Sequence, residues 1–160
     1  MRLYLETTVF NWFIDDRPER EDVIALFEAI REGRHEGFTS QYVEYELRRT
    51  AEPKRNQMLG LIEEYEIQIL QTSMEADELA EKYIAQGIIP PSYRLDSTHI
   101  ACATIHGLDC VVSYNFNHIN RIKTKQRTEA VNREEGYGSV VICTAREVLN
   151  DDQPEEERPV

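Results

Sequence analysis

Acidic and amide side chains stand where predicted strands end or predicted helices begin. Glu6 follows a short apolar strand, and Glu44 and Glu46 lie on the helix that follows a second strand. Asp96 lies in the first turns of a later helix, and Asn115 comes directly after the strand that this helix precedes. Ligands of open parallel sheets bind beyond the carboxyl ends of the strands. We therefore expect these side chains to meet at one edge of a sheet.

The chemistry available to such a cluster is that of a divalent cation. Carboxylate and amide oxygens are the donors that Mg²⁺ and Mn²⁺ prefer, and Mg²⁺ keeps part of its hydration shell. A cation held in this way can acidify an attacking water and neutralise charge on a phosphodiester. The residue types therefore predict hydrolysis of a phosphodiester.

Each acidic residue also has an ordinary structural interpretation. Glu6 could cap the following helix, and Asp96 could be a helix N-terminal charge favoured by the dipole. Glu44 and Glu46 flank the apolar stripe of their helix almost symmetrically, so helical spacing does not choose between them. Asp96 is the strongest candidate because it lies on a helix face that is otherwise apolar and small and that includes Ile100 and Ala103. An unpaired carboxylate on such a face is costly. His99 on that face is interpreted as a packed, hydrogen-bonded histidine.

Short apolar strands that alternate with helices predict an α/β domain with a parallel sheet covered on both faces. The chain of 160 residues suits one domain over residues 1–149, followed by an acidic, disordered tail at 150–160. The predicted strands are 2–5, 38–39, 66–70, 109–113 and 139–143. The predicted helices are 9–14, 19–31, 41–50, 53–64, 74–86, 92–106 and 145–149, with a partly helical segment at 116–135.

Composition indicates a cytoplasmic protein without a membrane segment. No apolar stretch reaches the roughly 18 to 20 residues that cross a bilayer, and the first residues lack a signal-peptide pattern. Three cysteines without paired spacing indicate buried, reduced thiols. The net charge of −12 argues against broad electrostatic binding of nucleic acid. The cations are clustered, however, in segments 48–55 and 121–133.

The segments 3–9, 40–47, 95–103 and 111–119 resemble the four sequence blocks of PIN-domain proteins. The blocks occur in the order and at the spacing of that family, and with the last predicted strand they cover residues 1–149. The resemblance implies a three-layer α/β/α sandwich with a central, mainly parallel sheet of four to five strands. Many small members are similar to VapC-type toxins, Mg²⁺-dependent ribonucleases that an antitoxin neutralises.

The resemblance assigns the site residue by residue. It implies catalytic roles for Glu6, Glu46, Asp96 and Asn115, with the first three as ligands of Mg²⁺ or Mn²⁺, and it selects Glu46 over Glu44. Glu6 stands where the family usually has aspartate, and Asn115 where many members have a fourth acid. Both departures weaken the metal site. The chain is therefore expected to be a metal-dependent endoribonuclease, with an inactive RNA- or protein-binding PIN domain as the alternative.

Further residues are expected to contact substrate or partners. Five polar or basic side chains near the predicted site are candidates for binding RNA: Thr7, His118, Arg121, Lys123 and Lys125. The resemblance also implies a cognate antitoxin and a homodimer. Aromatic residues near the site are expected to be core or to line a groove for a dimer or antitoxin partner: Phe10, Trp12, Phe13 and Tyr42.

Overall fold

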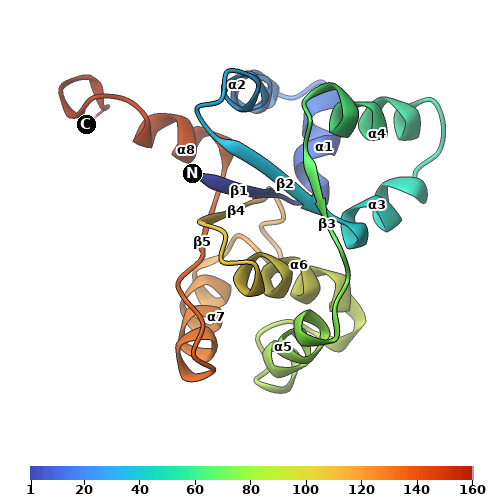
Figure 1. Ribbon diagram of the computed structural model, residues 1–160, viewed down its shortest axis with the longest axis vertical. Helices are drawn as coiled ribbons and strands as arrows, with labels where there is room; N and C mark the ends of the chain where they lie inside the picture. The colour runs from blue at the N-terminus through green and yellow to red at the C-terminus, as the bar shows by residue number, and fades with distance from the viewer. Residues whose placement is uncertain (160) are drawn as a thin grey trace.

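A computed structural model describes residues 1–159. One five-stranded sheet runs through the molecule in the order β3-β2-β1-β4-β5, and every neighbouring pair is parallel (Figure 1). The strands are β1 (Arg2–Leu5), β2 (Glu36–Ser40), β3 (Gln68–Leu70), β4 (Cys110–Val112) and β5 (Val141–Cys143). The predicted parallel sheet is therefore confirmed.

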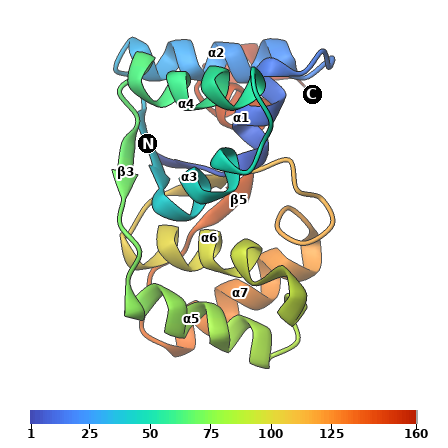
Figure 2. The ribbon, with the colours of Figure 1, turned by 90° about the vertical axis from the view of Figure 1, so that its right-hand side faces the viewer.

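Helices cover both faces of the sheet. They are α1 (Thr7–Ile14), α2 (Arg20–Arg31), α3 (Gln41–Arg48), α4 (Lys54–Glu64), α5 (Met74–Ala85), α6 (Arg94–Ile105), α7 (Ile122–Glu134) and α8 (Ala145–Asp151). Short 3₁₀ turns lie at Pro91–Tyr93 and Glu155–Glu157. Helices α1, α2 and α4 lie on one side of the sheet, and α5, α6 and α7 on the other (Figure 2). This is the three-layer α/β/α sandwich expected from the sequence.

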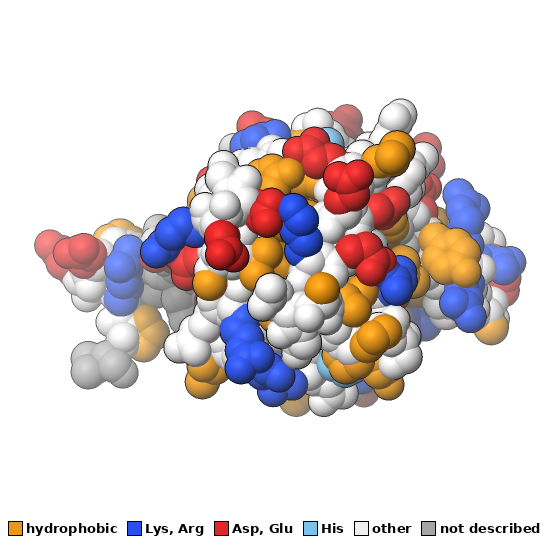
Figure 3. Space-filling view, turned by 90° about the horizontal axis from the view of Figure 1, so that it is seen from below, with side chains coloured by type: hydrophobic (Ala, Val, Ile, Leu, Met, Phe, Trp, Pro, Cys, Tyr) orange, Lys and Arg blue, Asp and Glu red, His pale blue; other side chains and the backbone are white. Residues whose placement is uncertain are grey.

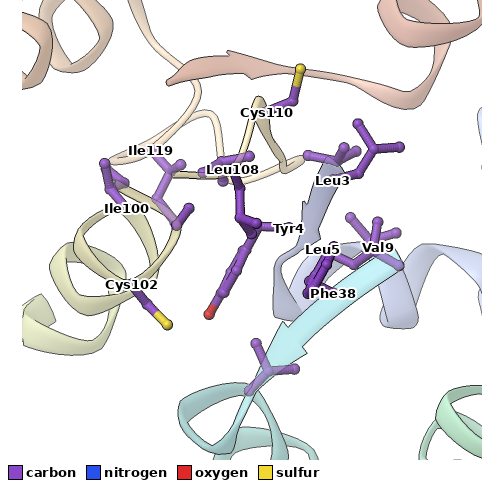
Figure 4. Packing of buried hydrophobic residues seen from close by; sticks show 14 of the residues in the cluster. Leu3, Tyr4, Leu5, Val9, Phe38, Ile100, Cys102, Leu108, Cys110 and Ile119 are labelled. Atoms are coloured by element: carbon purple, nitrogen blue, oxygen red, sulfur yellow. The ribbon is translucent and has the colours of Figure 1, made fainter. Parts of the chain in front are cut away.

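The core forms because successive residues of β1 point to opposite faces of the sheet. Leu3, Tyr4 and Leu5 are all fully buried. Leu3 and Leu5 lie toward Val9, whereas the Tyr4 ring extends toward α6 (Figure 4). Since β1 is central and apolar on both faces, the residue that follows it enters the interior of the molecule as well.

The ends of several elements differ from the predictions for local physical reasons. Helix α1 begins at Thr7 because the Glu6 side chain accepts a hydrogen bond from the Thr8 N–H. Strand β3 begins at Gln68 because Glu66 has a left-handed φ of 53°, which ends the preceding helical segment. Strand β2 begins at Glu36, before the predicted strand at 38–39, because Glu36 pairs with Arg2 of β1.

The C-terminal segment is anchored beyond the predicted domain boundary at 149. Helix α8 continues to Asp151, and the Asp152 carboxylate lies 2.6 Å from Nε2 of the buried His35. The predicted tail thus overlaps the end of α8, and its last residue, Val160, lies outside the described residues. Among residues 1–159, no helix is long and apolar enough to cross a membrane.

Candidate active site

The site lies where the order of the strands reverses. Strand β1 has β2 on one side and β4 on the other. Strands β2 and β3 extend the sheet in one direction from β1, and β4 and β5 extend it in the other. Crevices open beyond the carboxyl ends of strands at such a point. Glu6 follows β1, α3 begins directly after β2, and residues 113–115 follow β4. The fold therefore brings the predicted segments to one edge.

Glu6 is a buried carboxylate with one oxygen fully engaged. The residue is 2% exposed, and Oε2 accepts hydrogen bonds of 2.7 Å from both the backbone N–H and the hydroxyl of Thr8. Its Oε1 has no hydrogen-bond partner within the described part of the chain. Burial, with a smaller contribution from the charge of Glu46, raises the pKa of Glu6 to about 7, although His99 and Thr8 oppose this. Glu6 is therefore a helix cap with one oxygen left for other chemistry.

Glu46 is held by a chain of hydrogen bonds that starts in β1. Its Oε1 accepts a 2.9 Å bond from the Thr7 hydroxyl and pairs with Nε2 of the fully buried His99. The other ring nitrogen of His99 lies 2.8 Å from the Tyr4 hydroxyl, which lies 2.6 Å from the Ser40 hydroxyl. These contacts fix the orientation of Glu46 from two neighbouring strands.

The Glu46–His99 contact favours an ion pair. Burial alone would raise the pKa of Glu46, but the hydrogen bond and charge of His99 outweigh it, and the pKa is lowered. Burial alone would lower the pKa of His99, but Glu46 outweighs it, and the pKa is raised. The two opposite shifts have the same cause, which is mutual stabilisation of the charged forms.

The structure separates the two glutamates of α3 that the helical pattern left equivalent. Glu46 faces Thr7 and His99. Glu44 instead lies 3.7 Å from Arg48 and lines a different hollow, beside β3. Only Glu46 therefore belongs to the cluster at the carboxyl edge of the sheet.

Asp96 anchors a second group of polar side chains. Its Oδ2 lies 2.9 Å from Nδ1 of His118, whose backbone N–H donates a 3.0 Å bond to Oδ1 of Asn115. Burial raises the pKa of Asp96, while His99, Asn115 and His118 partly offset that effect. The His118 ring also packs on Tyr93, with 4.0 Å between ring centroids. Asn115 therefore shapes the turn after β4 and presents His118 to Asp96.

Asp96, Asn115 and His118 line an open cavity of about 480 Å³. Other parts of its wall come from Thr8, Tyr93, Tyr114, Phe116 and Asn117. The Thr8 hydroxyl links this cavity to Glu6, because it donates to the Glu6 carboxylate and accepts from the Tyr114 N–H at 2.8 Å. Asp96 is thus the predicted acidic residue that lines the open cavity, and Glu6 lies one hydrogen bond behind its wall.

The predicted side chains do not form a closed cation cage. Within residues 1–159, no three His, Cys, Asp or Glu side chains gather closely enough to hold a metal ion by themselves. Oxygen atoms of Glu6, Asp96 and Asn115 are nevertheless the hard donors that a hydrated Mg²⁺ accepts, and Mg²⁺ usually takes only one or two protein carboxylates. The donor chemistry fits a cation that keeps several waters.

The predicted cations of the α7 segment do not line this cavity. Arg121 donates to the Asn117 carbonyl and Lys123 to the Gly87 carbonyl, and Lys125 lies on α7. The face that contains α5 and α7 carries Lys and Arg side chains interspersed with Asp and Glu (Figure 3). RNA binding by these three cations therefore stays a prediction.

Several residues of the site were not singled out from the sequence. Thr8 had a local signal, since it follows the capping residue Glu6 by two positions. Tyr4 has the sequence context of an ordinary strand residue, because the partners of its hydroxyl, Ser40 and His99, lie far away in the sequence. Tyr93 and Phe116 are 51% and 53% exposed, and exposure of this kind is not visible in a sequence.

Comparison with known proteins identifies the family. The family model described as "PIN domain" matches residues 3–125, which include all four segments of the site. The chain belongs to the PIN domain family. None of the curated proteins compared with it matches in sequence.

Solved structures of other proteins share the fold of this PIN domain. VapBC2 from Rickettsia felis, solved bound to a DNA fragment from its promoter, is 15% identical with a TM-score of 0.53. The match covers 75% of this chain and 94% of that one. VapC20 from Mycobacterium tuberculosis, described as a sarcin-ricin loop cleaving toxin, is 11% identical with a TM-score of 0.54, over 72% and 92% of the two chains. At these identities the likeness is one of fold.

Proposed function

We propose that this PIN domain is a toxin-like endoribonuclease that uses a divalent cation to hydrolyse RNA phosphodiesters. The observation that carries the proposal is the placement of Asp96 on the wall of an open cavity, with the buried carboxylate of Glu6 bonded to Thr8 of the same wall. The similarity in fold to a protein described as a sarcin-ricin loop cleaving toxin supports the choice of substrate.

The cation in this proposal is Mg²⁺ or Mn²⁺. Glu6, Asp96 and Glu46 would hold it, each directly or through a water bound to the ion. When bound, such an ion supplies an acidified water and neutralises charge on the phosphodiester. The waters are needed because three protein side chains do not close around one point in residues 1–159.

The chain's own residues would orient the reactants and move protons. Asp96 is fixed by His118, and the Asn115 amide can orient a water or a phosphate oxygen. Glu6 would hold the ion as a deprotonated carboxylate, and because its pKa without the ion is about 7, binding of the ion would release a proton near neutral pH. Thr7 and His99 keep Glu46 in one orientation. Hydrolysis by water would leave a 5′-phosphate.

Cleavage of a mixed-sequence single-stranded RNA tests this proposal. We expect Mn²⁺ to support cleavage by the wild-type protein, EDTA to abolish it, and Asp96→Asn to remove it. Glu44→Gln is the matched control, because it changes a glutamate of the same helix α3 outside the cluster, and it should cleave normally. Cleavage that survives Asp96→Asn would contradict the proposed role of the cavity.

The alternative is a PIN domain that binds RNA or a protein without cutting. Glu6 and Asn115 favour this alternative. Glu6 is longer than the aspartate usual in the family, and Asn115 lacks the charge of the acid that many members have there. In that case Mn²⁺ would support no cleavage by the wild-type protein, although RNA would still bind. The same assay therefore separates the two functions.

An antitoxin and a second copy of the chain are the proposed partners. The VapBC2 structure supports a partner protein, because it contains a toxin-like chain together with its companion. Co-expression with the product of a small neighbouring reading frame, followed by size-exclusion chromatography, tests for both partners. A monomer that never co-elutes with that product would contradict this part.

A further inference from the structure

Aromatic side chains enclose a second hollow next to the acidic cavity. Trp12 stacks on Tyr114, with 4.1 Å between ring centroids and 18° between ring planes. Phe116 meets both rings at steep angles, at 6.3 Å from each. The hollow has a volume of about 300 Å³, and these three residues line it together with Pro18. A sequence pattern did not suggest this arrangement, because Trp12 belongs to α1 and the other two rings follow β4.

The aromatic hollow and the acidic cavity share a wall. Tyr114 and Phe116 line both. Tyr114 is firmly placed, because its N–H donates to the Thr8 hydroxyl and its own hydroxyl accepts a 3.2 Å bond from the Ala145 N–H. Through Thr8 the same network reaches Glu6. A group bound in the hollow would therefore lie at a fixed position relative to the acidic residues.

Phe116 is an exposed aromatic residue at the border of the two cavities. The residue is 53% accessible, although aromatic neighbours are in contact range. Exposed aromatic faces beside a nucleic-acid site act as stacking platforms for unpaired bases, with little preference for sequence. The exposed face of the Phe116 ring is therefore available for stacking with a planar group at the border of the two cavities.

Polar groups on the rim suit the edge of a nucleobase. Asp22 accepts a 2.9 Å bond from Arg146, and both line the hollow together with the exposed Glu19. Carboxylates accept hydrogen bonds from base N–H groups, and a guanidinium donates to ring nitrogens and carbonyls. Arg17, whose guanidinium lies 4.4 Å from the Trp12 ring centroid, adds a cation that could meet a phosphate. An apolar peptide would cover the Asp22–Arg146 ion pair without offering it hydrogen bonds.

We propose that the hollow formed by Trp12, Tyr114 and Phe116 is a subsite for one unpaired base of single-stranded RNA, adjacent to the phosphodiester held at Asp96. The inference rests on the proposed function, since it fixes where one base of that substrate lies relative to Asp96. A base-paired strand would be a poor substrate, because its bases are stacked on one another and would have to be extruded first.

Trp12 gives a direct assay, because it is the only tryptophan of the chain. A short single-stranded RNA oligonucleotide is titrated in EDTA, so that no metal-dependent cleavage occurs, and a ribose-phosphate oligomer of equal length without bases is titrated in parallel. We expect saturable quenching of Trp12 fluorescence by the RNA and weaker binding, by about tenfold or more, of the abasic oligomer.

Variants then separate stacking from a general effect on the fold. Phe116→Ala should weaken RNA binding by about tenfold, whereas Phe116→Tyr, which keeps a ring, should restore it. Tyr45→Ala is the control, since Tyr45 is 55% exposed and lines neither cavity. Equal binding of the abasic oligomer, or unchanged RNA binding by Phe116→Ala, would overturn the subsite. The nuclease proposal would be unaffected, because it is tested by metal-dependent cleavage at Asp96.

Discussion

The raised pKa of Glu6 predicts a specific loss of stability with increasing pH. Below about pH 4.5, the ordinary value for a glutamate, both the folded and the unfolded chain hold this proton. Between that pH and about 7, the unfolded chain releases the proton while the folded chain keeps it. Proton uptake by the folded state stabilises it, so this contribution is present at low pH and is lost as pH rises through 7.

The size of the effect follows from the two pKa values. The gap between the folded value of about 7 and the ordinary value of 4.5 corresponds to about 3 kcal/mol of unfolding free energy. Glu6→Gln removes the titration and keeps an amide oxygen that can accept from Thr8 in place of Oε2. We therefore expect Glu6→Gln to be more stable than the wild type by up to about 3 kcal/mol above pH 7, and the difference to shrink toward zero as the pH falls.

Urea denaturation between about pH 5 and about pH 8 measures this difference. The wild type should lose unfolding free energy across the interval relative to Glu6→Gln. The control is Glu63→Gln, which changes an exposed glutamate of α4 and should follow the wild type. Parallel curves for Glu6→Gln and the wild type would refute the inference that Glu6 is held in a desolvated position.

Three further outcomes are expected. Tyr4→Phe removes a buried hydroxyl that contacts Ser40 and His99, and should lower the unfolding free energy by about 1 to 3 kcal/mol in urea denaturation; an unchanged midpoint would contradict this. Thr8→Val removes the hydroxyl that donates to Glu6 and accepts from a backbone N–H, with an expected loss of about 1 to 3 kcal/mol by the same measurement. Mn²⁺ should raise the melting temperature of the wild type and not of Asp96→Asn, because a ligand that binds only the folded state stabilises it; equal shifts in calorimetry would place the cation elsewhere.

The sheet and its helices could be predicted because the relevant signals are local. Apolar strand segments such as residues 3–5 are buried on both faces, as a parallel sheet requires. Ser40, Ser73 and Thr144 each cap the helix that follows, and serine or threonine before a periodic apolar segment is a local signal of a helix start. Errors occurred at strand ends, where Glu66 shows that a single backbone angle decides the boundary.

The site was less predictable, because it depends on contacts between distant residues. Helical spacing left Glu44 and Glu46 equivalent, and only the packing of α3 against His99 and Thr7 distinguishes them. The sequence likewise gave no sign that Tyr4 would bond to His99, which lies 95 residues along the chain. The burial of Glu6 follows from the central place of β1 in the sheet, and that order of strands is a property of the whole fold.

The chemistry of the RNA ends tests the central claim most directly. If a metal-activated water attacks the phosphodiester, the products carry a 5′-phosphate and a 3′-hydroxyl, and the 2′-hydroxyl takes no part. We therefore predict 5′-phosphate ends after incubation with Mn²⁺, and continued cleavage of a substrate with a 2′-deoxyribose at the scissile position. Products with a 2′,3′-cyclic phosphate, or loss of cleavage on removal of the 2′-hydroxyl, would contradict hydrolysis at the acidic cluster of Glu6, Glu46 and Asp96.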